Sequence, residues 1–233
     1  MRIQGLQKLT LLDYPEKLAC TVFTPGCNFR CPFCHNASLV RGTEEEPMTE
    51  EAFFAFLQSR RGILEGVCVT GGEPTLQPDL PAFLARIKGL GFAVKLDTNG
   101  YRPAVLKQLV AAGLIDYVAM DVKNAPEKYP LTAGVEGLDV ERIRESVAFL
   151  LTDAVDYEFR TTVVKELHTA ADIEGICLWI RGAKRYYLQN FEDSGDLLSE
   201  GFSGCDKETL AAYLNLSKKI LGQVELRGVT SIS

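Results

Sequence analysis

The sequence lacks the features that mark membrane, secreted or nucleic-acid-binding proteins. No apolar run approaches the ~20 residues of a membrane span, and the first 17 residues lack the apolar core of a secretory signal. Acidic residues outnumber basic ones by 31 to 25, which gives a net charge of −6. A chain of this charge is not expected to bind nucleic acid or an anionic membrane. We therefore expect a cytoplasmic protein with neither partner.

The chain also lacks a linker rich in proline, glycine or serine. Its 233 residues, 46% of them hydrophobic, are enough to bury a sizeable core. The sequence therefore predicts one domain over residues 1–233. Within it we expect an N-terminal extension at 1–17, six βα units at 18–191, and a C-terminal helix and strand at 192–233.

An odd number of cysteines, seven, fits a reducing compartment better than a disulfide framework. Cys20, Cys68 and Cys177 lie in apolar stretches and are expected in the core. No role is assigned to Cys205.

Three cysteines form a CxxxCxxC array, Cys27, Cys31 and Cys34, a spacing expected by chance below ~0.01 times in such a chain. Clustered thiolates favour zinc or an iron–sulfur cluster. A structural zinc site needs four protein ligands, and His35 directly follows Cys34, an awkward position for the fourth. A cubane cluster tolerates three cysteines if a small molecule binds the fourth iron. Zinc completed by His35 or a distant cysteine remains the alternative.

Six β-prone runs alternate with helical patterns or long loops. The runs are 18–23, 67–70, 92–96, 117–120, 157–164 and 185–188, and a further strand-like segment lies at 224–229. This alternation predicts an α/β fold of right-handed βαβ units whose parallel sheet curls toward a barrel. Because a full eight-unit barrel needs ~250 residues, a partial (β/α)6 TIM-like barrel fits better.

Polar motifs follow several of these runs, at the strand ends where such sheets bind ligands. Gly71 and Gly72 would allow the backbone to approach a ligand closely, and Glu73 adds an acceptor. A plain turn before Pro74 is the alternative.

The run at 92–96 leads into Asp97, Thr98 and Asn99, which offer acceptors for an amino group or ribose hydroxyls. An ordinary turn with Gly100 at positive φ is the alternative.

Asp121 and Lys123 are two residues apart at the end of the fourth run, so they should project to one face. They form either part of a site or a strand-end ion pair. Arg160 could bind a ligand carboxylate as a planar fork donor or point outward. We expect His168 on a surface loop, without a catalytic role.

The cysteine array, with the aromatic Phe33 before its last cysteine, resembles the radical S-adenosylmethionine (SAM) superfamily. More narrowly, the segments FTPGCNFRCPFCHN and VTGGEP resemble the activating proteins of anaerobic ribonucleoside-triphosphate reductase, a subgroup of glycyl-radical-enzyme activases. The resemblance covers nearly the whole chain. It implies the (β/α)6 form, a [4Fe–4S] cluster on Cys27, Cys31 and Cys34, and Phe33 as a cofactor contact.

The resemblance also implies that GGEP contacts the amino group of SAM, whose amino nitrogen and carboxylate chelate the iron left open. In pyruvate formate-lyase activase, segments that match DTNG and DVK place carboxylates on a monovalent cation and a lysine near SAM. By resemblance, Asp97, Thr98 and Asp121 would bind that cation, and Lys123 would lie near SAM as a catalytic residue. Asn190 stands near the position where that activase carries a histidine beside the nucleoside.

Reductive cleavage of SAM would then yield a 5′-deoxyadenosyl radical that abstracts a backbone glycine hydrogen. The implied partners are a glycyl radical enzyme, in particular anaerobic ribonucleotide reductase, and an electron donor such as flavodoxin or ferredoxin. One alternative is a small-molecule radical SAM enzyme resembling 7-carboxy-7-deazaguanine synthases. Another is a zinc-binding module without catalysis.

Serine substitution tests the three-ligand assignment. Replacement of Cys27, Cys31 or Cys34 should abolish the absorbance of an anaerobically reconstituted cluster, because each would remove one iron ligand. Cys20→Ser and Cys68→Ser serve as controls that should retain the cluster. Loss of the cluster in either control would refute the assignment.

Overall fold

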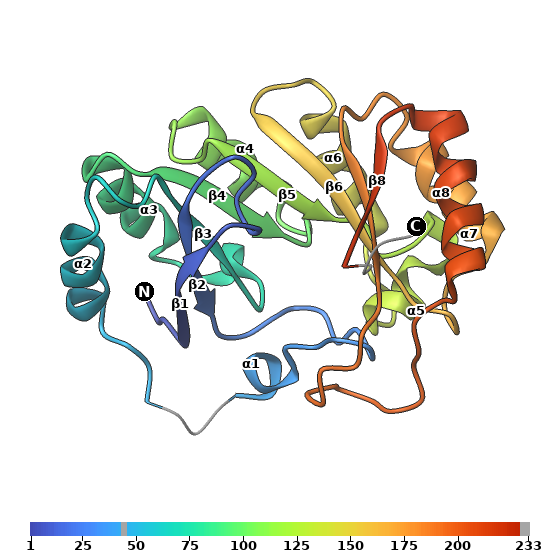
Figure 1. The fold of residues 1–233 in the computed structure, drawn as a ribbon, viewed down its shortest axis with the longest axis horizontal. Helices are drawn as coiled ribbons and strands as arrows, with labels where there is room; N and C mark the ends of the chain where they lie inside the picture. The colour runs from blue at the N-terminus through green and yellow to red at the C-terminus, as the bar shows by residue number, and fades with distance from the viewer. Residues whose placement is uncertain (43–45, 229–233) are drawn as a thin grey trace. The chain divides into compact units, whose positions relative to one another are not determined.

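The computed structural model describes residues 1–42 and 46–228. In this part of the chain, eight strands form a sheet in the order β1-β2-β3-β4-β5-β6-β7-β8 (Figure 1). The strands are β1 (Gly5–Thr10), β2 (Ala19–Thr24), β3 (Gly66–Gly71), β4 (Ala93–Thr98), β5 (Tyr117–Asp121), β6 (Asp156–Val163), β7 (Tyr186–Asn190) and β8 (Val224–Arg227). The predicted α/β class is confirmed.

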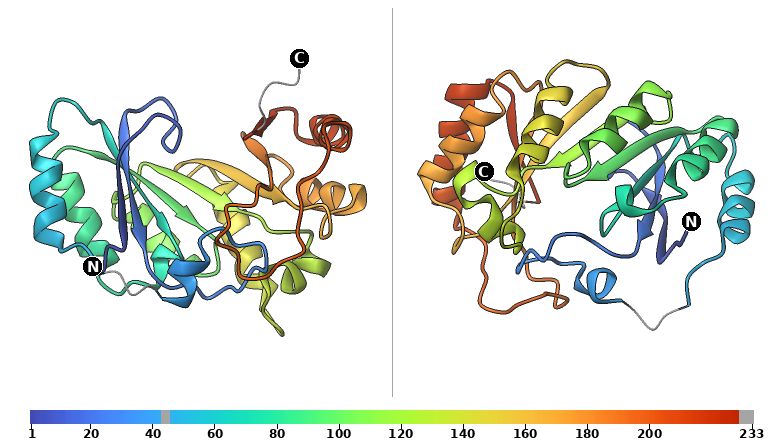
Figure 2. Two further views of the ribbon diagram at one scale, coloured as in Figure 1. Left: turned by 60° about the horizontal axis from the view of Figure 1, so that its bottom comes forward. Right: turned by 180° about the vertical axis from the view of Figure 1, so that it is seen from behind.

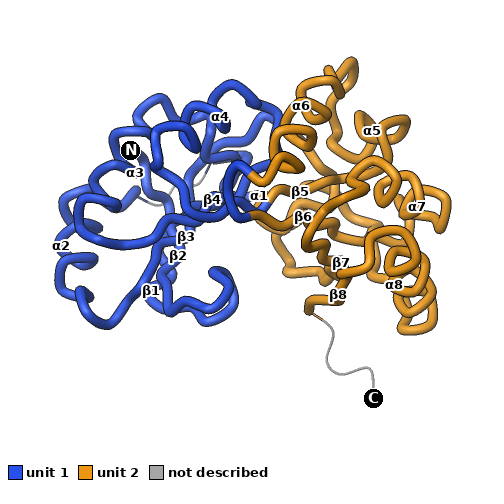
Figure 3. Tube along the Cα trace, turned by 90° about the horizontal axis from the view of Figure 1, so that it is seen from above, with its two compact units in different colours: residues 1–28, 38–119, 154–156 blue, residues 29–37, 120–153, 157–233 orange. Residues whose placement is uncertain are grey.

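The chain forms two compact units (Figure 3). Unit 1 contains residues 1–28, 38–119 and 154–156, and unit 2 contains 29–37, 120–153 and the residues from 157 onward.

Unit 1 holds β1 to β4. Strand β1 pairs antiparallel with β2, whereas β2, β3 and β4 are parallel neighbours. Three longer helices belong to this unit, α2 (Glu50–Ser59), α3 (Leu80–Gly89) and α4 (Pro103–Ala111), with the short η1 (Pro74–Leu76) after β3. Helices α2 and α3 pack through aromatic rings, with the Phe53 and Phe54 centroids each 5.3 Å from that of Phe83.

Unit 2 holds β6, β7 and β8 as parallel neighbours. Its helices are α5 (Tyr129–Ala133), α6 (Val140–Leu150), α7 (Ala170–Trp179) and α8 (Lys207–Leu221), with the short η2 (Pro126–Lys128) before α5. Helices α7 and α8 lie side by side in Figures 1 and 2. The Trp179 ring meets Tyr129 edge-on, with centroids 5.7 Å apart.

Strands β2 to β7 correspond to the six predicted strands. The N-terminal extension adds β1, and β8 lies within the predicted strand-like segment at 224–229, whose residue 229 is outside the described part. The segment between β5 and α6 contains the short helix α5, and its C-cap, Gly134, has the left-handed conformation (φ 64°). A short helix α1 (Ala37–Arg41) follows the cysteine array.

Within residues 1–42 and 46–228, no helix combines the length and apolar character needed to cross a membrane.

Candidate active site at the strand ends

In unit 1, the turns after three neighbouring parallel strands meet. The β2 turn leads to Cys27, β3 ends in Gly71 and leads to Glu73, and β4 ends in Thr98 and leads to Asn99. Carboxyl ends of parallel strands share one sheet edge. The structure therefore brings together three of the motifs that the sequence placed at a ligand site.

The β3 turn lies directly on the backbone that leads into the cysteine array. Gly72 N donates to Thr24 O and Glu73 N to Gly26 O, both at 2.8 Å. A Cβ on Gly72 would lie 1.9 Å from Gly26 O, and one on Gly71, at φ +116°, would lie 2.3 Å from Thr24 N. The sequence suggested glycine for close approach to a ligand. The close neighbour found here is the protein's own backbone.

Glu73 links the turn after β3 to the turn after β4 through hydrogen bonds. Its carboxylate is 1% exposed and accepts hydrogen bonds from Thr75 N (3.1 Å), Thr98 Oγ1 (2.8 Å) and Asn99 N (2.7 Å). Burial raises the pKa of Glu73, and these hydrogen bonds oppose that rise. The carboxylate, predicted as an acceptor for a ligand, is engaged by the protein itself.

Asn99 reaches from the β4 turn to the residues at the first cysteine. Its Nδ2 donates to Asn28 Oδ1 at 2.9 Å and lies 3.9 Å from Cys27 Sγ, while its Oδ1 accepts from Tyr101 N at 3.0 Å. Thr98 Oγ1 likewise accepts from the next turn, at Gly100 N (3.1 Å). SAM contacts by these side chains stay predictions.

Asp97 forms an ion pair with Lys95, a residue that the sequence reasoning missed. The Lys95 side chain is 1% exposed, and its Nζ also lies 3.7 Å from Cys68 Sγ. Cys68 Sγ is in turn 3.6 Å from Asp97 Oδ1. The sequence does contain a sign of this pair, because Lys95 stands two residues before Asp97 in the strand AVKLDT. Side chains two residues apart lie on the same face of a strand.

In unit 2, the cysteine loop is held by backbone contacts with α5 and the segment after β7. Arg30 N donates to Ala133 O (2.9 Å), and a Cβ on Gly134 would lie 2.1 Å from Arg30 O. Phe33, predicted as a cofactor contact, packs edge-on against Phe191 with centroids 6.4 Å apart. Gly134 thus allows α5 to lie against the loop, a role without a local sequence signal.

Asp121 and Lys123, at the end of the fourth predicted strand, form an ion pair, and Arg160 is a second cation on the same carboxylate. Lys123 Nζ and Arg160 Nε each lie 3.0 Å from one oxygen of the Asp121 carboxylate. Burial alone would raise the pKa of Asp121, but the two cations lower it well below its usual range. Burial disfavours the Lys123 ammonium, yet Asp121 and the nearby Cys31 raise its pKa. Lys123 therefore lies within electrostatic reach of one array cysteine, as a protonated side chain.

His168 is buried at 2% exposure, so its predicted place on a surface loop is wrong. Val164 N donates to Nδ1 at 3.0 Å, which leaves Nε2–H to donate to Lys123 O at 2.9 Å. Burial lowers the pKa of His168, so the ring is neutral. The histidine supports the backbone of Lys123.

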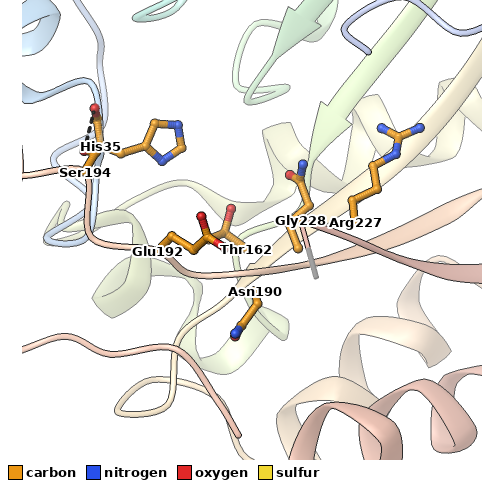
Figure 4. Close-up of a pocket in the computed structure, with 8 residues that line it drawn as sticks. His35, Thr162, Asn190, Glu192, Ser194, Arg227 and Gly228 are labelled. Carbon is orange, nitrogen blue, oxygen red and sulfur yellow. Dashed lines mark hydrogen bonds between the residues drawn. The ribbon is translucent and has the colours of Figure 1, made fainter. Parts of the chain in front are cut away.

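A cavity of about 290 Å³ opens at the carboxyl ends of β6, β7 and β8 in unit 2 (Figure 4). Polar and charged side chains dominate its lining, which comprises His35, Thr162, Gln189, Asn190, Glu192, Ser194, Arg227 and Gly228. Asn190 exchanges hydrogen bonds with the backbone of Cys205, at 3.1 and 2.9 Å. Its predicted nucleoside contact stays a prediction, and its amide already orders the segment at Cys205.

The donor set fits an iron–sulfur cluster. None of the seven cysteines, all of them in the described part of the chain, forms a disulfide, and Cys31 is buried whereas Cys27 and Cys34 are partly exposed. Beside Cys27, Asn28 Nδ2 is buried without a hydrogen-bond partner, a donor suited to an anionic group. Among the described residues, no group of three or more His, Cys, Asp or Glu side chains is arranged to hold a single metal ion.

The fit of a monovalent cation is poorer. Asp97 is paired with Lys95, and Asp121 with Lys123 and Arg160, so each carboxylate already has a basic partner in its own unit. A metal cation there would add positive charge to sites that are already neutralised.

Gly72→Ala should destabilise the protein by about 3 kcal/mol, because the new Cβ would collide with the Gly26 carbonyl. Gly89→Ala is a matched control at the end of α3, where an added Cβ meets nothing within 4 Å. The control should be neutral or stabilising by up to ~1 kcal/mol. Denaturant unfolding measures both, and similar stability of the two variants would contradict the close approach.

Asp121→Asn should lower the free energy of unfolding by about 2 kcal/mol at pH 7, because two partly buried cations lose their carboxylate. The depressed pKa of Asp121 means that the ionised pair adds stability above the unfolded pKa of ~3.9 and loses it as pH falls. The difference from wild type should therefore shrink by about 1 kcal/mol between pH 7 and pH 3.

Unfolding curves at both pH values would measure this change. Asp153→Asn, which removes an exposed pair with Lys184, is the control and should have little effect at pH 7. An Asp121→Asn difference that is the same at pH 7 and pH 3 would refute the depressed pKa.

Known proteins are similar to this chain over different shares of its length. A Methanocaldococcus jannaschii protein, named as a candidate glycyl-radical enzyme activating enzyme, is 32% identical over 97% of this chain and 96% of its own. The pyruvate formate-lyase-activating enzyme of Clostridium pasteurianum is 25% identical over 82% of this chain and 87% of its own. A 7-carboxy-7-deazaguanine synthase of Koribacter versatilis is 32% identical over only 58% of this chain and 56% of its own.

Among solved structures, Streptococcus suis SuiB bound to S-adenosylmethionine superposes with a TM-score of 0.68 at 15% identity. The match covers 89% of this chain and 52% of SuiB, and it confirms the predicted partial-barrel fold. Residues 21–166 match the profile of the radical SAM superfamily. Because that profile spans more than half of the chain and includes the cysteine array, the chain belongs to the radical SAM superfamily.

Proposed function

We propose that this protein is a glycyl-radical-enzyme activase whose partner is an anaerobic ribonucleotide reductase. The observation that carries the proposal is the match to the M. jannaschii protein over nearly the full length of both chains. The match to a 7-carboxy-7-deazaguanine synthase covers little more than half of each chain, so the small-molecule alternative has weaker support. Membership of an enzyme superfamily makes the noncatalytic zinc module wrong.

Radical SAM membership implies a [4Fe–4S] cluster and SAM. We assign the cluster to Cys27, Cys31 and Cys34, supported by their spacing and by thiols that are not tied up in disulfides. When bound, the reduced cluster supplies the electron that cleaves SAM to methionine and a 5′-deoxyadenosyl radical. The protein contributes binding, orientation and exclusion of water.

The chain's own side chains would position the two cofactors. Glu73 keeps the β3 and β4 turns together, so that both turns would present a fixed backbone surface to SAM. We place the protonated Lys123 beside SAM, since it lies within electrostatic reach of Cys31. Arg160 holds the Asp121 carboxylate that orients Lys123, and we therefore assign Arg160 a positioning role.

We place the nucleoside of SAM at the polar cavity beside Asn190. Hydroxyl and amide groups such as Thr162 and Gln189 provide donors and acceptors of the kind that ribose and adenine require. We place the protein in the cytoplasm, a reducing environment that fits cysteines without disulfides. A small electron-transfer protein such as flavodoxin or ferredoxin would reduce the cluster.

An electron paramagnetic resonance experiment tests the function. The reduced, cluster-loaded protein incubated with SAM and an anaerobic ribonucleotide reductase should produce a glycine-centred doublet in the spectrum of the reductase. Cys31→Ser, which removes a proposed iron ligand, is the control and should give no doublet. SAM cleavage without a glycyl radical, together with hydrogen loss from a small metabolite, would overturn the proposal in favour of the synthase-like alternative.

A further inference from the structure

Lys95 is a buried lysine inside a strand that is otherwise apolar except at its end. Its side chain is 1% exposed, and it lies between Val94 and Leu96, both 0% exposed. An isolated ammonium in such a setting is strongly disfavoured and normally loses its proton. The Asp97 carboxylate, two residues on and 12% exposed, compensates for that cost.

Residues of the two neighbouring strands form a row across the sheet with Lys95. Cys68 on β3 lies opposite Lys95 in the sheet, and Thr21 on β2 lies opposite Cys68. Cys68 Sγ contacts both members of the pair, at 3.7 Å from Lys95 Nζ and 3.6 Å from Asp97 Oδ1. Thr21 is itself fixed by a hydrogen bond to Asp13 (2.5 Å). The ammonium is therefore held in place by its packing and not by a flexible surface contact.

The position of the pair gives it a functional consequence. Asp97 is the last residue but one of β4, directly before Thr98 and Asn99, which carry the contacts to Glu73 and toward Cys27. Its ionised carboxylate needs a counter-charge, because the site is largely shielded from solvent. Lys95 supplies one positive charge at this point without any dissolved ion.

We propose that the Lys95 ammonium is a built-in counter-cation of Asp97 that takes the place of a bound monovalent metal ion. The pairing stands on the geometry of unit 1 alone, whereas its importance for SAM cleavage rests on the proposed function. The protein therefore works without Na⁺ or K⁺, and removal of the lysine side chain creates a requirement for one of these ions.

Thermal unfolding of the cluster-loaded protein tests the pairing in NaCl, KCl and tetramethylammonium chloride at equal ionic strength. Wild type should have the same melting temperature in all three salts. Lys95→Ala removes the ammonium and opens space beside the Asp97 carboxylate, so Na⁺ or K⁺ should raise its melting temperature by at least about 3 °C over tetramethylammonium, an ion too large to enter. The double variant Lys95→Ala/Asp97→Asn should lose that response.

The rate of 5′-deoxyadenosine formation is measured in the same salts. Wild type should vary less than twofold, and Lys95→Ala should be at least tenfold slower in tetramethylammonium than in NaCl or KCl. Lys88→Ala is the matched control, because Lys88 pairs with Asp116 at 2.6 Å where both side chains are about one-third exposed. Solvent screens that pair, so this variant should show no ion-specific response.

A saturable dependence of wild type on Na⁺ or K⁺ would overturn the proposal, as would a Lys95→Ala response no larger than that of Lys88→Ala. If Lys95→Ala does not fold, the double variant is compared with Asp97→Asn, which removes the carboxylate charge beside the buried ammonium. Greater stability of the double variant supports the pairing, and equal or lower stability refutes it. The thermal-unfolding measurement does not depend on catalysis. Absence of SAM cleavage would therefore refute the proposed function, while the unfolding data would still test the pairing of Lys95 with Asp97.

Discussion

The hydrogen bonds to the buried Glu73 carboxylate are the interaction on which the unit 1 site depends. One carboxylate accepts from the backbone or side chains of Thr75, Thr98 and Asn99, and so connects the turns after two parallel strands. Gly72 brings the first of these turns against Gly26, one residue before the first array cysteine. Because buried acceptors and backbone contacts leave little freedom, the turns form one rigid element.

Charge is balanced locally in each unit. Asp97 is neutralised by Lys95 in unit 1, while Asp121 is shared by Lys123 and Arg160 in unit 2. Buried pairs of this kind contribute little net stability, but removal of one partner strongly destabilises the folded protein. Their main effect is to fix which groups are ionised beside the strand-end turns, and this preorganisation is what a radical enzyme needs from its protein.

Much of the fold could be predicted from local sequence patterns, since strand runs and apolar stripes such as Leu80, Phe83, Leu84 and Ile87 depend on nearby residues. The array and strand-end motifs were also visible. The partners of Glu73 and the burial of His168 were not, because they depend on contacts between segments 25 to 45 residues apart. The glycines were identified, but the backbone that requires them could be found only in three dimensions.

Deuterium transfer tests the central claim, that this chain directs radical chemistry at a glycine of a protein partner. Candidate anaerobic reductase labelled at the glycine α-carbon is incubated with the reduced, cluster-loaded protein and SAM, and 5′-deoxyadenosine is analysed by mass spectrometry. The account predicts one deuterium in 5′-deoxyadenosine, in step with glycyl radical formation. Unlabelled 5′-deoxyadenosine formed at the full rate, with no radical on the reductase, would contradict it.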